Sequence, residues 1–488
     1  MNAARISSLL ILLGWPVGCP AAAAEPLCIG MAETDITPPL KFPMAGYYHE
    51  RLATGVLDPL KAHAIVFREG PQQAAWVACD IIGIAVDLSD EVRRQASART
   101  GIPAANIFLT ATHTHTAPDY TKDLYEYLGI TPLSAAAEKH PYAAQLISGI
   151  VAAIVQAHTQ ARPVLVEAGS AQQTTPVSFN RRFLMKDGSV RTWMRLDNPD
   201  VVRAAGPIDP EVAILRVLSA DGRQTFGVVS NFALHLDTTG GTLWSADYPH
   251  YIEQSLRKTL GANVISVFGN GCCGDINHVD PVGKDRLKPD FIGQSLAGTI
   301  AAALPRLRRV QQPRLRVCST TVRLPLQEVT AEQLAKAYEL VPRAKRGQQV
   351  DFFDLVSAYK ALVLDQLRHR PAARKTTELL SWGLSRRWSG VGDSLPAEVH
   401  VIALGREVAV VGLAGEVFVE LGLAIKRGSP FKTTLVVELA NCVETIYVPT
   451  RSACERGSYE VTNSTVQPGS GEMLVEAVLR LLREAAQE

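Results

Sequence analysis

Several features that define large classes of proteins are missing from this sequence. After residue 24, no apolar run approaches the roughly 20 residues that a membrane-spanning helix needs. The net charge of +1 gives no support for nucleic-acid binding or for the steering of other polyanions. No Ser/Gly-rich linker, block of like charge or internal repeat divides the chain. We therefore expect one large domain with no transmembrane segment and no nucleic-acid partner.

Cysteines and aromatic residues are present but few. Eight cysteines among 488 residues are too sparse for a disulfide scaffold, so disulfides are optional in an exported protein of this size. The adjacent Cys272 and Cys273 are most simply two small, half-buried residues; a vicinal disulfide and a metal-facing thiolate are the alternatives. An aromatic content of 6% and the lack of a membrane-docking helix count mildly against a dedicated lipid enzyme.

The first 24 residues have the composition of a targeting segment. Arg5 supplies a positive start, residues 6–14 form an apolar stretch, and Ala21–Ala24 provide a small-residue cleavage site. This pattern predicts a signal peptide cleaved after Ala24 and a mature protein that is secreted or periplasmic. Cys19 raises the alternative of a lipoprotein signal, to which Pro16 is poorly suited.

The remaining chain, 47% hydrophobic over its full length, can bury a large core. Residues 25–60 are interpreted as an extended lead-in, and 180–199 as an irregular stretch. Elsewhere, short apolar runs predict strands and longer runs with helical spacing predict helices. Strands are expected at 63–68, 74–84, 106–111, 211–218, 223–234, 263–268, 407–413 and 434–439, and helices at 87–98, 141–160, 331–388 (mostly) and 471–488. This predicts an α/β fold: a large mixed β-sheet domain over 25–488, flanked by helices, with a helical insertion near 330–390.

Two histidines follow the strand expected at 106–111, in the stretch THTHTAP that begins at Thr112. Residues two positions apart on a strand point to the same face, so His113 and His115 are expected to serve one site. They also lie at the carboxyl end of the strand, where open α/β sheets place their sites. The motif therefore favours a metal or acid–base centre, and Asp80 in the strand 74–84 is a candidate carboxylate partner for a ligating histidine.

Other chemically capable residues follow other predicted strands in the same way. His235 follows the run 223–234, Glu416 follows 407–413, and Tyr447 comes after 434–439. The run 263–268 leads into a polar, Gly-rich loop at 269–275. Two histidines, a glutamate and a tyrosine at successive strand ends suit zinc, whose catalytic sites leave one position open for water.

Taken together, these motifs resemble the neutral/alkaline, non-lysosomal ceramidase family over nearly all of the mature chain. The stretches that carry the resemblance are GMAETDITP from Gly30, THTH from Thr112, NFALH ending in His235, Gly-Asn and Gly-Asp within 269–275, Gly415-Glu416, YVPT from Tyr447, and Tyr459-Glu460. These motifs, in this order along the chain, are more specific together than any one of them.

The resemblance implies an exported, Zn²⁺-dependent amidohydrolase that cleaves the N-acyl amide bond of ceramide or a related lipid with a metal-activated water. It implies the zinc ligands His113, His235, Glu416 and Tyr447. His115 is then an acid–base residue beside the metal, and Arg181 and Tyr459 face the scissile carbonyl. Such donors stabilise the oxyanion, while the metal polarises the carbonyl.

Two departures from the family pattern bear on the substrate. The ceramidases carry a catalytic Ser two residues after their Gly-Asp pair, where this chain has Asn277. An amide cannot replace a hydroxyl as a nucleophile or proton relay, but it can orient a water or bind a substrate oxygen. The family's C-terminal immunoglobulin-like domain has no counterpart after Tyr459. Two alternatives therefore stand beside ceramide hydrolysis: the same zinc site acting on another amide or a sugar derivative, and a non-catalytic binding protein of this fold.

Overall fold

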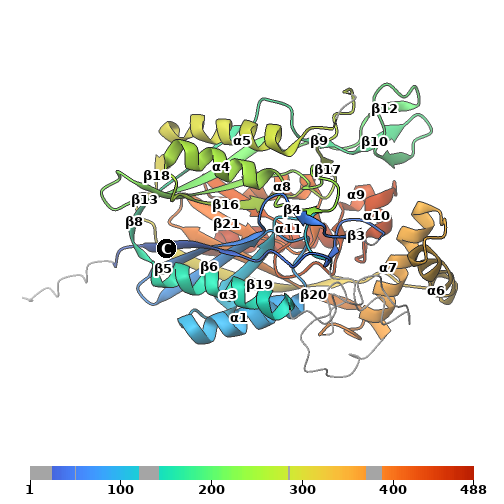
Figure 1. The fold of residues 1–488 in the computed structure, drawn as a ribbon, viewed down its shortest axis with the longest axis horizontal. Coiled ribbons are helices and arrows are strands. Elements are labelled where there is room, and N and C mark those ends of the chain that lie inside the picture. The colour runs from blue at the N-terminus through green and yellow to red at the C-terminus, as the bar shows by residue number, and fades with distance from the viewer. Residues whose placement is uncertain (1–24, 50, 120–141, 284–285, 370–386, 488) are drawn as a thin grey trace, which may run out of the picture.

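The computed structural model describes residues 25–49, 51–119, 142–283, 286–369 and 387–487. Two β-sheets pack face to face, and helices cover the outer face of each (Figure 1). The predicted α/β class, a large mixed sheet flanked by helices, is confirmed. The second sheet is a feature that the strand pattern alone did not separate from the first. The predicted signal peptide, residues 1–24, lies outside the described residues.

The larger sheet has nine strands in the order β16-β14-β13-β8-β1-β5-β6-β7, with β18 also pairing with β8. Its strands are β1 (Cys28–Asp35), β5 (Lys61–Glu69), β6 (Gln72–Cys79), β7 (Ile107–Ala111), β8 (Arg162–Gln172), β13 (Glu211–Ser219), β14 (Thr225–Phe232), β16 (Ile265–Asn270) and β18 (Arg308–Arg309). The pairs β6–β7 and β14–β16 are parallel, and the other pairs are antiparallel. The sheet is therefore mixed, as predicted.

The smaller sheet has the order β19-β20-β21-β23. Its strands are β19 (Leu315–Pro325), β20 (Ser394–Leu404), β21 (Val408–Gly412) and β23 (Thr433–Val437), and its parallel pair is β21–β23. Side chains alternate along β20: Ile402 and Leu404 pack with Trp76 of the larger sheet, whereas Val401 and Ala403 face the helices behind. This period of two places apolar residues on both faces of a sheet that is covered on both sides.

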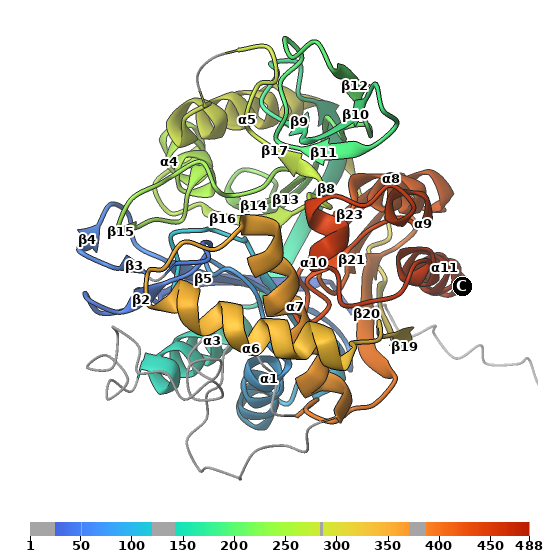
Figure 2. The same cartoon turned by 90° about the vertical axis from the view of Figure 1, so that its right-hand side faces the viewer.

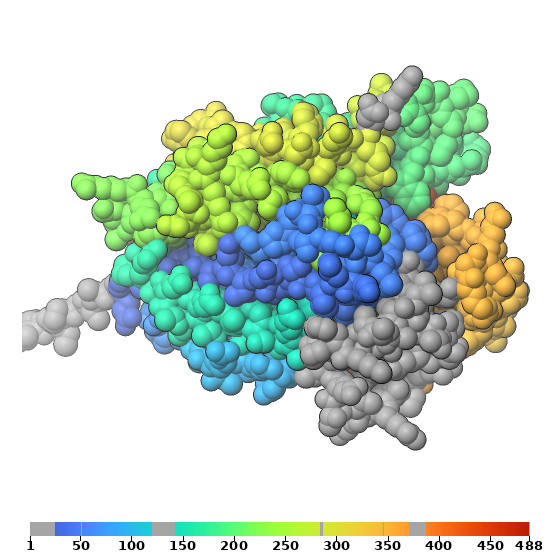
Figure 3. Space-filling model, in the orientation of Figure 1, coloured from blue at the N-terminus to red at the C-terminus, as the bar shows by residue number. Residues whose placement is uncertain are grey.

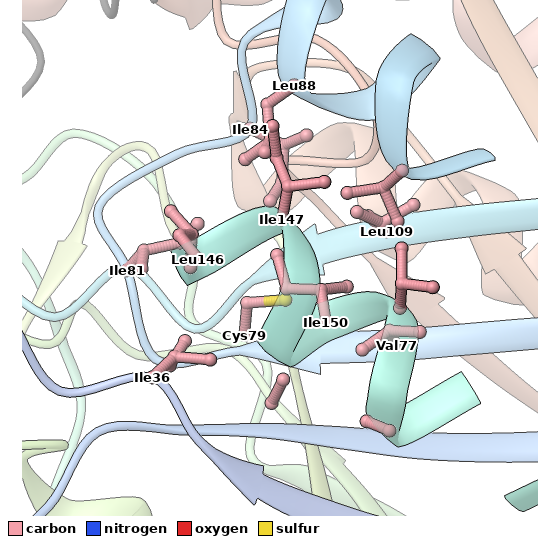
Figure 4. Close-up of a cluster of buried hydrophobic side chains, with 14 of the residues drawn as sticks. Ile36, Val77, Cys79, Ile81, Ile84, Leu88, Leu109, Leu146, Ile147 and Ile150 are labelled. Carbon is pink, nitrogen blue, oxygen red and sulfur yellow. The ribbon is translucent and has the colours of Figure 1, made fainter. Parts of the chain in front are cut away.

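Helices on opposite sides close the two outer layers (Figure 2). The larger sheet is covered by α1 (Val86–Thr100), α3 (Tyr142–Thr159), α4 (Tyr248–Leu260) and α5 (Pro289–Ala303), and the smaller sheet by α8 (Val419–Gly428) and α11 (Ser470–Ala485). Figure 4 shows Ile147 and Ile150 of α3 packed toward Val77 and Leu109 of the strands. In the described ranges, no helix is long and apolar enough to cross a bilayer.

The helical insertion is also present. It consists of α6 (Ala331–Lys345) and α7 (Phe352–His369), which pack against each other through a small core of their own. A capping box begins α6. The Thr330 hydroxyl accepts a hydrogen bond from the main-chain N–H of Gln333, and the side-chain oxygen of Gln333 accepts one from the main-chain N–H of Thr330. The part of the predicted helical segment at 370–386 lies outside the described residues.

The prediction of an irregular stretch at 180–199 was wrong. This stretch contains β10 (Arg182–Met185) and β11 (Val190–Thr192); β10 pairs with β11 and with the following β12 (Val201–Ala204), while β9 (Phe179–Asn180) pairs with β17 (Ile276–Asn277). The lead-in at 25–60, interpreted as extended, begins with β1, an eight-residue strand inside the larger sheet. The strands near 180–204 are short and rich in polar residues, so they lack the apolar runs on which the prediction relied.

The N-terminus of α1 gives a prediction about pH. Glu444 Oε1 accepts a hydrogen bond from the Val86 amide nitrogen at 3.0 Å. Burial raises the pKa of Glu444 from its ordinary value of 4.5 to about 7. Between these values the folded protein keeps a proton that the unfolded chain has lost, so raising the pH from 4.5 to 7 lowers the free energy of unfolding, by about 3 kcal/mol at most.

The test is urea denaturation of the wild type and Glu444→Gln at pH 5 and pH 8. Glutamine is neutral at both pH values, so the variant is expected to lose less stability than the wild type between them. Equal losses in the two proteins would show that Glu444 does not titrate in this range.

Candidate active site at the carboxyl ends of the parallel strands

The histidine motif lies in a loop after β7. The strand ends at Ala111, and His113 has a left-handed backbone, with φ 77°. The loop is held by hydrogen bonds from the main chain to the end of β6 and beyond, including His113 N to Ile81 O at 3.0 Å. The prediction that His113 and His115 share one face of a strand was therefore wrong. Their rings nevertheless come together, with centroids 5.0 Å apart.

His235 completes a group of three imidazoles. It follows β14, and its ring centroid lies 4.5 Å from that of His113 and 5.1 Å from that of His115. One nitrogen of each ring lies within 4.8 Å of the others, which is close enough for the three to hold one metal ion. The carboxyl ends of β7 and β14 thus deliver the three rings to one place, as the strand-end argument predicted.

The other nitrogen of each ring faces a main-chain carbonyl. The acceptors are Ile82 O for His113 Nδ1 at 2.6 Å, Gly46 O for His115 Nδ1 at 3.1 Å, and Cys273 O for His235 Nδ1 at 3.4 Å. A carbonyl can only accept, so each Nδ1 carries a proton, and in the neutral ring Nε2 carries the lone pair. Histidines that bind a metal through one ring nitrogen commonly donate a hydrogen bond from the other in this way. The backbone therefore fixes three Nε2 lone pairs toward a common point.

These lone pairs are poorly satisfied by the protein itself. His113 Nε2 and His235 Nε2 lie 3.1 Å apart, a distance at which two lone pairs repel unless a proton or a cation lies between them. His115 Nε2 is buried and has no hydrogen-bond partner among the described residues. Buried polar groups without partners are rare in proteins. The donor set therefore fits a nitrogen-binding metal ion such as zinc.

Glu416 and Tyr447 reach the same place from the smaller sheet. Glu416 begins β22 (Glu416–Val417) and Tyr447 begins β24 (Tyr447–Val448), and the two residues are partners in this short parallel pair. Glu416 Oε2 lies 3.4 Å from His113 Nε2 and 3.9 Å from His235 Nε2. Within the described part of the chain, no group hydrogen-bonds this oxygen. The pairing of these two short strands thus places the Glu416 carboxylate and the Tyr447 phenol side by side.

The charges of the group depend on one another. Burial opposes a charge on His113, but the Glu416 carboxylate outweighs burial and raises the pKa of His113. Burial also opposes the charge on Glu416, yet His113 and Arg181 lower the pKa of that carboxyl. Burial, reinforced by the neighbouring His113, lowers the pKa of His115 to about 4. At neutral pH, His115 is consequently an uncharged imidazole.

Arg181 is held rigidly beside Tyr447. It follows β9, and its side chain donates from Nε to Glu460 at 2.8 Å and from Nη2 to Gly274 O at 2.7 Å and to the Tyr447 hydroxyl at 3.0 Å. The rings of Tyr447 and Tyr459 lie 5.6 and 5.8 Å from the guanidinium carbon. The structure thus brings the predicted Arg181 and Tyr459 together around Tyr447.

Glu460 is a residue of this region to which the sequence analysis gave no role. It is fully buried, and its carboxylate accepts hydrogen bonds from Arg181, from Arg182 Nη1 at 3.2 Å and from the Thr192 hydroxyl at 3.0 Å. Its carboxylate therefore orients the arginine nearest the candidate site. The dipeptide Tyr459-Glu460 is one of the motifs that carry the family resemblance, so the sequence does contain a signal for this glutamate.

Asn277, another of the predicted site residues, lies close to Arg181 in the fold. It is buried in β17, which pairs with β9, and its Oδ1 accepts from Val279 N at 3.2 Å. The next residue, His278, is also buried and pairs with Asp237, with 2.9 Å between Nδ1 and Oδ1. The charge of Asp237 in turn acts on His115 and His235, so this pair is linked to the group of imidazoles.

Two other predicted features have structural roles instead. Asp80 lies 3.6 Å from His63 and accepts from Thr112, so it faces a separate buried ion network and not a histidine of the site. Cys272 and Cys273 are free thiols, as are the other five cysteines from Cys28 onward. Cys273 Sγ donates to Glu438 at 2.9 Å. The vicinal-disulfide alternative is not what the structure contains.

Known proteins resemble this chain in both sequence and fold. The family model for the N-terminal part of neutral/alkaline non-lysosomal ceramidases matches residues 27–276, which is 250 of the 488 residues. Neutral ceramidase of Pseudomonas aeruginosa is 27% identical over 240 residues, or 48% of this chain and 33% of that protein. Neutral ceramidase B of Dictyostelium discoideum is 28% identical over 186 residues, or 36% of this chain and 24% of that protein. The matched region thus spans a third or less of each relative.

The fold agrees over a longer range. The crystal structure of the Pseudomonas aeruginosa neutral ceramidase superimposes with a TM-score of 0.68 at 20% identity, covering 95% of this chain and 76% of that one. A structure described as ceramidase complexed with C2 gives a TM-score of 0.67, also at 20% identity, covering 95% and 75%. With more than half of its residues matched by the family model, this chain belongs to the neutral/alkaline non-lysosomal ceramidase family.

Proposed function

We propose that this protein is a Zn²⁺-dependent amidohydrolase that cleaves N-acyl amide bonds. The observation that carries the proposal is the meeting of His113 Nε2, His235 Nε2 and Glu416 Oε2 within 3.1–3.9 Å of one another, with the buried Nε2 of His115 beside them. Membership of the ceramidase family supports hydrolysis of an amide. We further propose that residues 25–488 form one catalytic domain of an exported protein, following the composition of residues 1–24.

The proposed zinc ligands are His113, His235, Glu416 and Tyr447. When bound, the metal would polarise the substrate carbonyl and make a water nucleophilic near neutral pH. His115, uncharged at neutral pH, would accept a proton at Nε2 and pass it to the leaving amine. Burial, with Glu416 nearby, raises the pKa of Tyr447 far above its ordinary value. Without a metal, Tyr447 is therefore a neutral phenol whose oxygen accepts a hydrogen bond from Arg181.

Arg181 and Tyr459 would bind the substrate carbonyl oxygen. The Arg181 guanidinium is already fixed by Glu460 and Gly274, so it needs little reorganisation to stabilise a developing oxyanion. The Tyr459 hydroxyl lies 3.4 Å from the Tyr48 hydroxyl and has a proton to donate, because burial raises the pKa of Tyr459 well above its ordinary value. Both groups would act at the same carbonyl.

Asn277 favours a second substrate class. Ceramide or a related lipid is the substrate that the family suggests, but the serine position holds an amide in this chain. An amide side chain can bind a substrate oxygen, as another amide or a sugar derivative would offer. The same zinc site acting on such a substrate is therefore the second candidate.

The test combines metal analysis with hydrolysis of a short-chain ceramide and of simple N-acetyl amides. We expect about one zinc per chain, loss of hydrolysis on treatment with a chelator, and recovery when zinc is added. Asn277→Ser should raise ceramide hydrolysis and leave the zinc content unchanged, whereas Asn263→Ser, a surface control, should change neither. Full activity without a metal would contradict the proposal, and bound zinc without hydrolysis of any amide would favour the binding-protein alternative.

A further inference from the structure

Aromatic side chains are concentrated beside the candidate site, although the chain as a whole is poor in them. Three of them form a continuous surface, which we call the aromatic wall: Trp193, Phe352 and Tyr459. The ring centroids of Trp193 and Tyr459 lie 4.7 Å apart, those of Phe352 and Tyr459 lie 5.8 Å apart with planes 18° from parallel, and those of Trp193 and Phe352 lie 5.9 Å apart. Each separation is typical of interacting aromatic rings.

The wall is assembled from three distant segments. Trp193 directly follows β11, Phe352 begins α7, and Tyr459 begins α10 (Tyr459–Asn463). Figure 2 shows α7 and α10 side by side, and Figure 3 shows the β10–β12 region and the α6–α7 insertion at the same end of the molecule. The helical insertion therefore contributes directly to the surroundings of the candidate site.

The wall runs from the buried site to the solvent. Tyr459 is in contact with Tyr447 and lies beside Arg181. Trp193 and Phe352 are 47% and 38% exposed. Contiguous exposed apolar surface is one mark of a binding site, and this surface is continuous with Tyr459. An occupant of this surface would lie next to the groups proposed to bind the scissile carbonyl.

The backbone of Trp193 is a second, independent indication of function. Its φ of 63° is in the left-handed region, which is unfavourable for a bulky residue. A hydrogen bond from Trp193 N to Arg181 O at 2.8 Å maintains this conformation. Strained backbone of this kind is concentrated at functional sites. The strain keeps an exposed indole fixed against Tyr459.

We propose that the aromatic wall binds a ring on the amine side of the amide substrate, and that Trp193 and Phe352 determine this specificity. The inference rests on the proposed amidohydrolase function. A planar ring can add to the existing stack through favourable ring–ring geometry, in addition to burying apolar area. An alkyl chain gains only from the burial of area. Among the amides that the proposed function allows, the wall therefore favours one with a ring close to the scissile bond over one with only a long alkyl chain.

The experiment compares two amides whose amines have the same number of carbon atoms, N-acetyl-2-phenylethylamine and N-acetyl-octylamine. The octyl chain is the more hydrophobic of the two, so an unspecific apolar surface would favour it. We expect the wild type to favour the phenyl compound by about two- to tenfold in kcat/KM. Trp193→Ala and Phe352→Ala should remove this preference, Trp193→Phe should keep part of it, and the exposed control Phe291→Ala on α5 should retain it.

Binding is measured separately through tryptophan fluorescence, so the result does not depend on turnover. A saturable change on addition of the phenyl compound, present in the wild type and absent in Trp193→Phe, would support the wall even if neither amide were hydrolysed. In that case ring binding by the wall would stand, and the amidohydrolase proposal would fail if the short-chain ceramide were not hydrolysed either. Hydrolysis with a preference for the octyl compound that Trp193→Ala leaves unchanged would overturn the wall and preserve the hydrolase.

Discussion

Replacement of His113 by alanine is expected to abolish both zinc binding and amide hydrolysis. His113 Nε2 lies close to two of its three proposed fellow ligands, at 3.1 Å from His235 Nε2 and 3.4 Å from Glu416 Oε2. Its removal leaves a gap at the centre of the donor set. Because a metal ion supplies several kcal/mol of stabilisation to the transition state, hydrolysis should fall by about a thousandfold or more.

Metal content and kcat/KM are measured together on the purified variant. The matched control is His250→Ala, which removes an imidazole on α4 whose Nε2 pairs with Gln254 of the same helix. The control should keep wild-type zinc and activity. If His113→Ala retained stoichiometric zinc, the ligand set proposed above would be incorrect, even if activity were lost.

Replacement of Glu460 by glutamine is expected to cause the largest loss of stability. Its carboxylate is fully buried and compensates two buried arginines, Arg181 and Arg182. Breaking a buried ion pair by removing one partner leaves an uncompensated charge and typically costs about 3–5 kcal/mol. The same change frees the Arg181 side chain, so kcat should fall as well.

The measurement is the free energy of unfolding of the metal-free protein, so that loss of zinc does not contribute. Glu339→Gln is the matched control: Glu339 pairs with Arg343 one turn away on the exposed surface of α6, and such pairs contribute little. A cost for Glu460→Gln as small as that of the control would mean that the arginines find other partners.

The sequence was informative about where the site lies and less so about how its side chains are oriented. Apolar runs located the strands, and the residues after them, His113, His235 and Glu416, do meet at one edge of the sheets. The period of two used to align His113 with His115 did not apply, because the strand ends at Ala111. A loop with a left-handed residue has no simple periodicity.

Features that depend on distant parts of the chain could not be predicted from local patterns. The carbonyl of Gly46 orients His115 across 69 positions of sequence. The pairing of Glu416 with Tyr447 relies on strands of two residues, too short to leave a pattern. Trp193 lies in a stretch interpreted as irregular, so its place beside Tyr459 came only from the structure.

The separation of the site residues along the chain also has a consequence for folding. His113 and His235 belong to the first half of the sequence, whereas Glu416 and Tyr447 arrive more than 180 positions after His235. Contacts between such distant segments form slowly, because a long loop must close before they contribute any stabilisation. During synthesis, the imidazoles are made well before the carboxylate and the phenol that join them. We therefore expect the proposed zinc site to become complete late in folding, when the smaller sheet docks on the larger one.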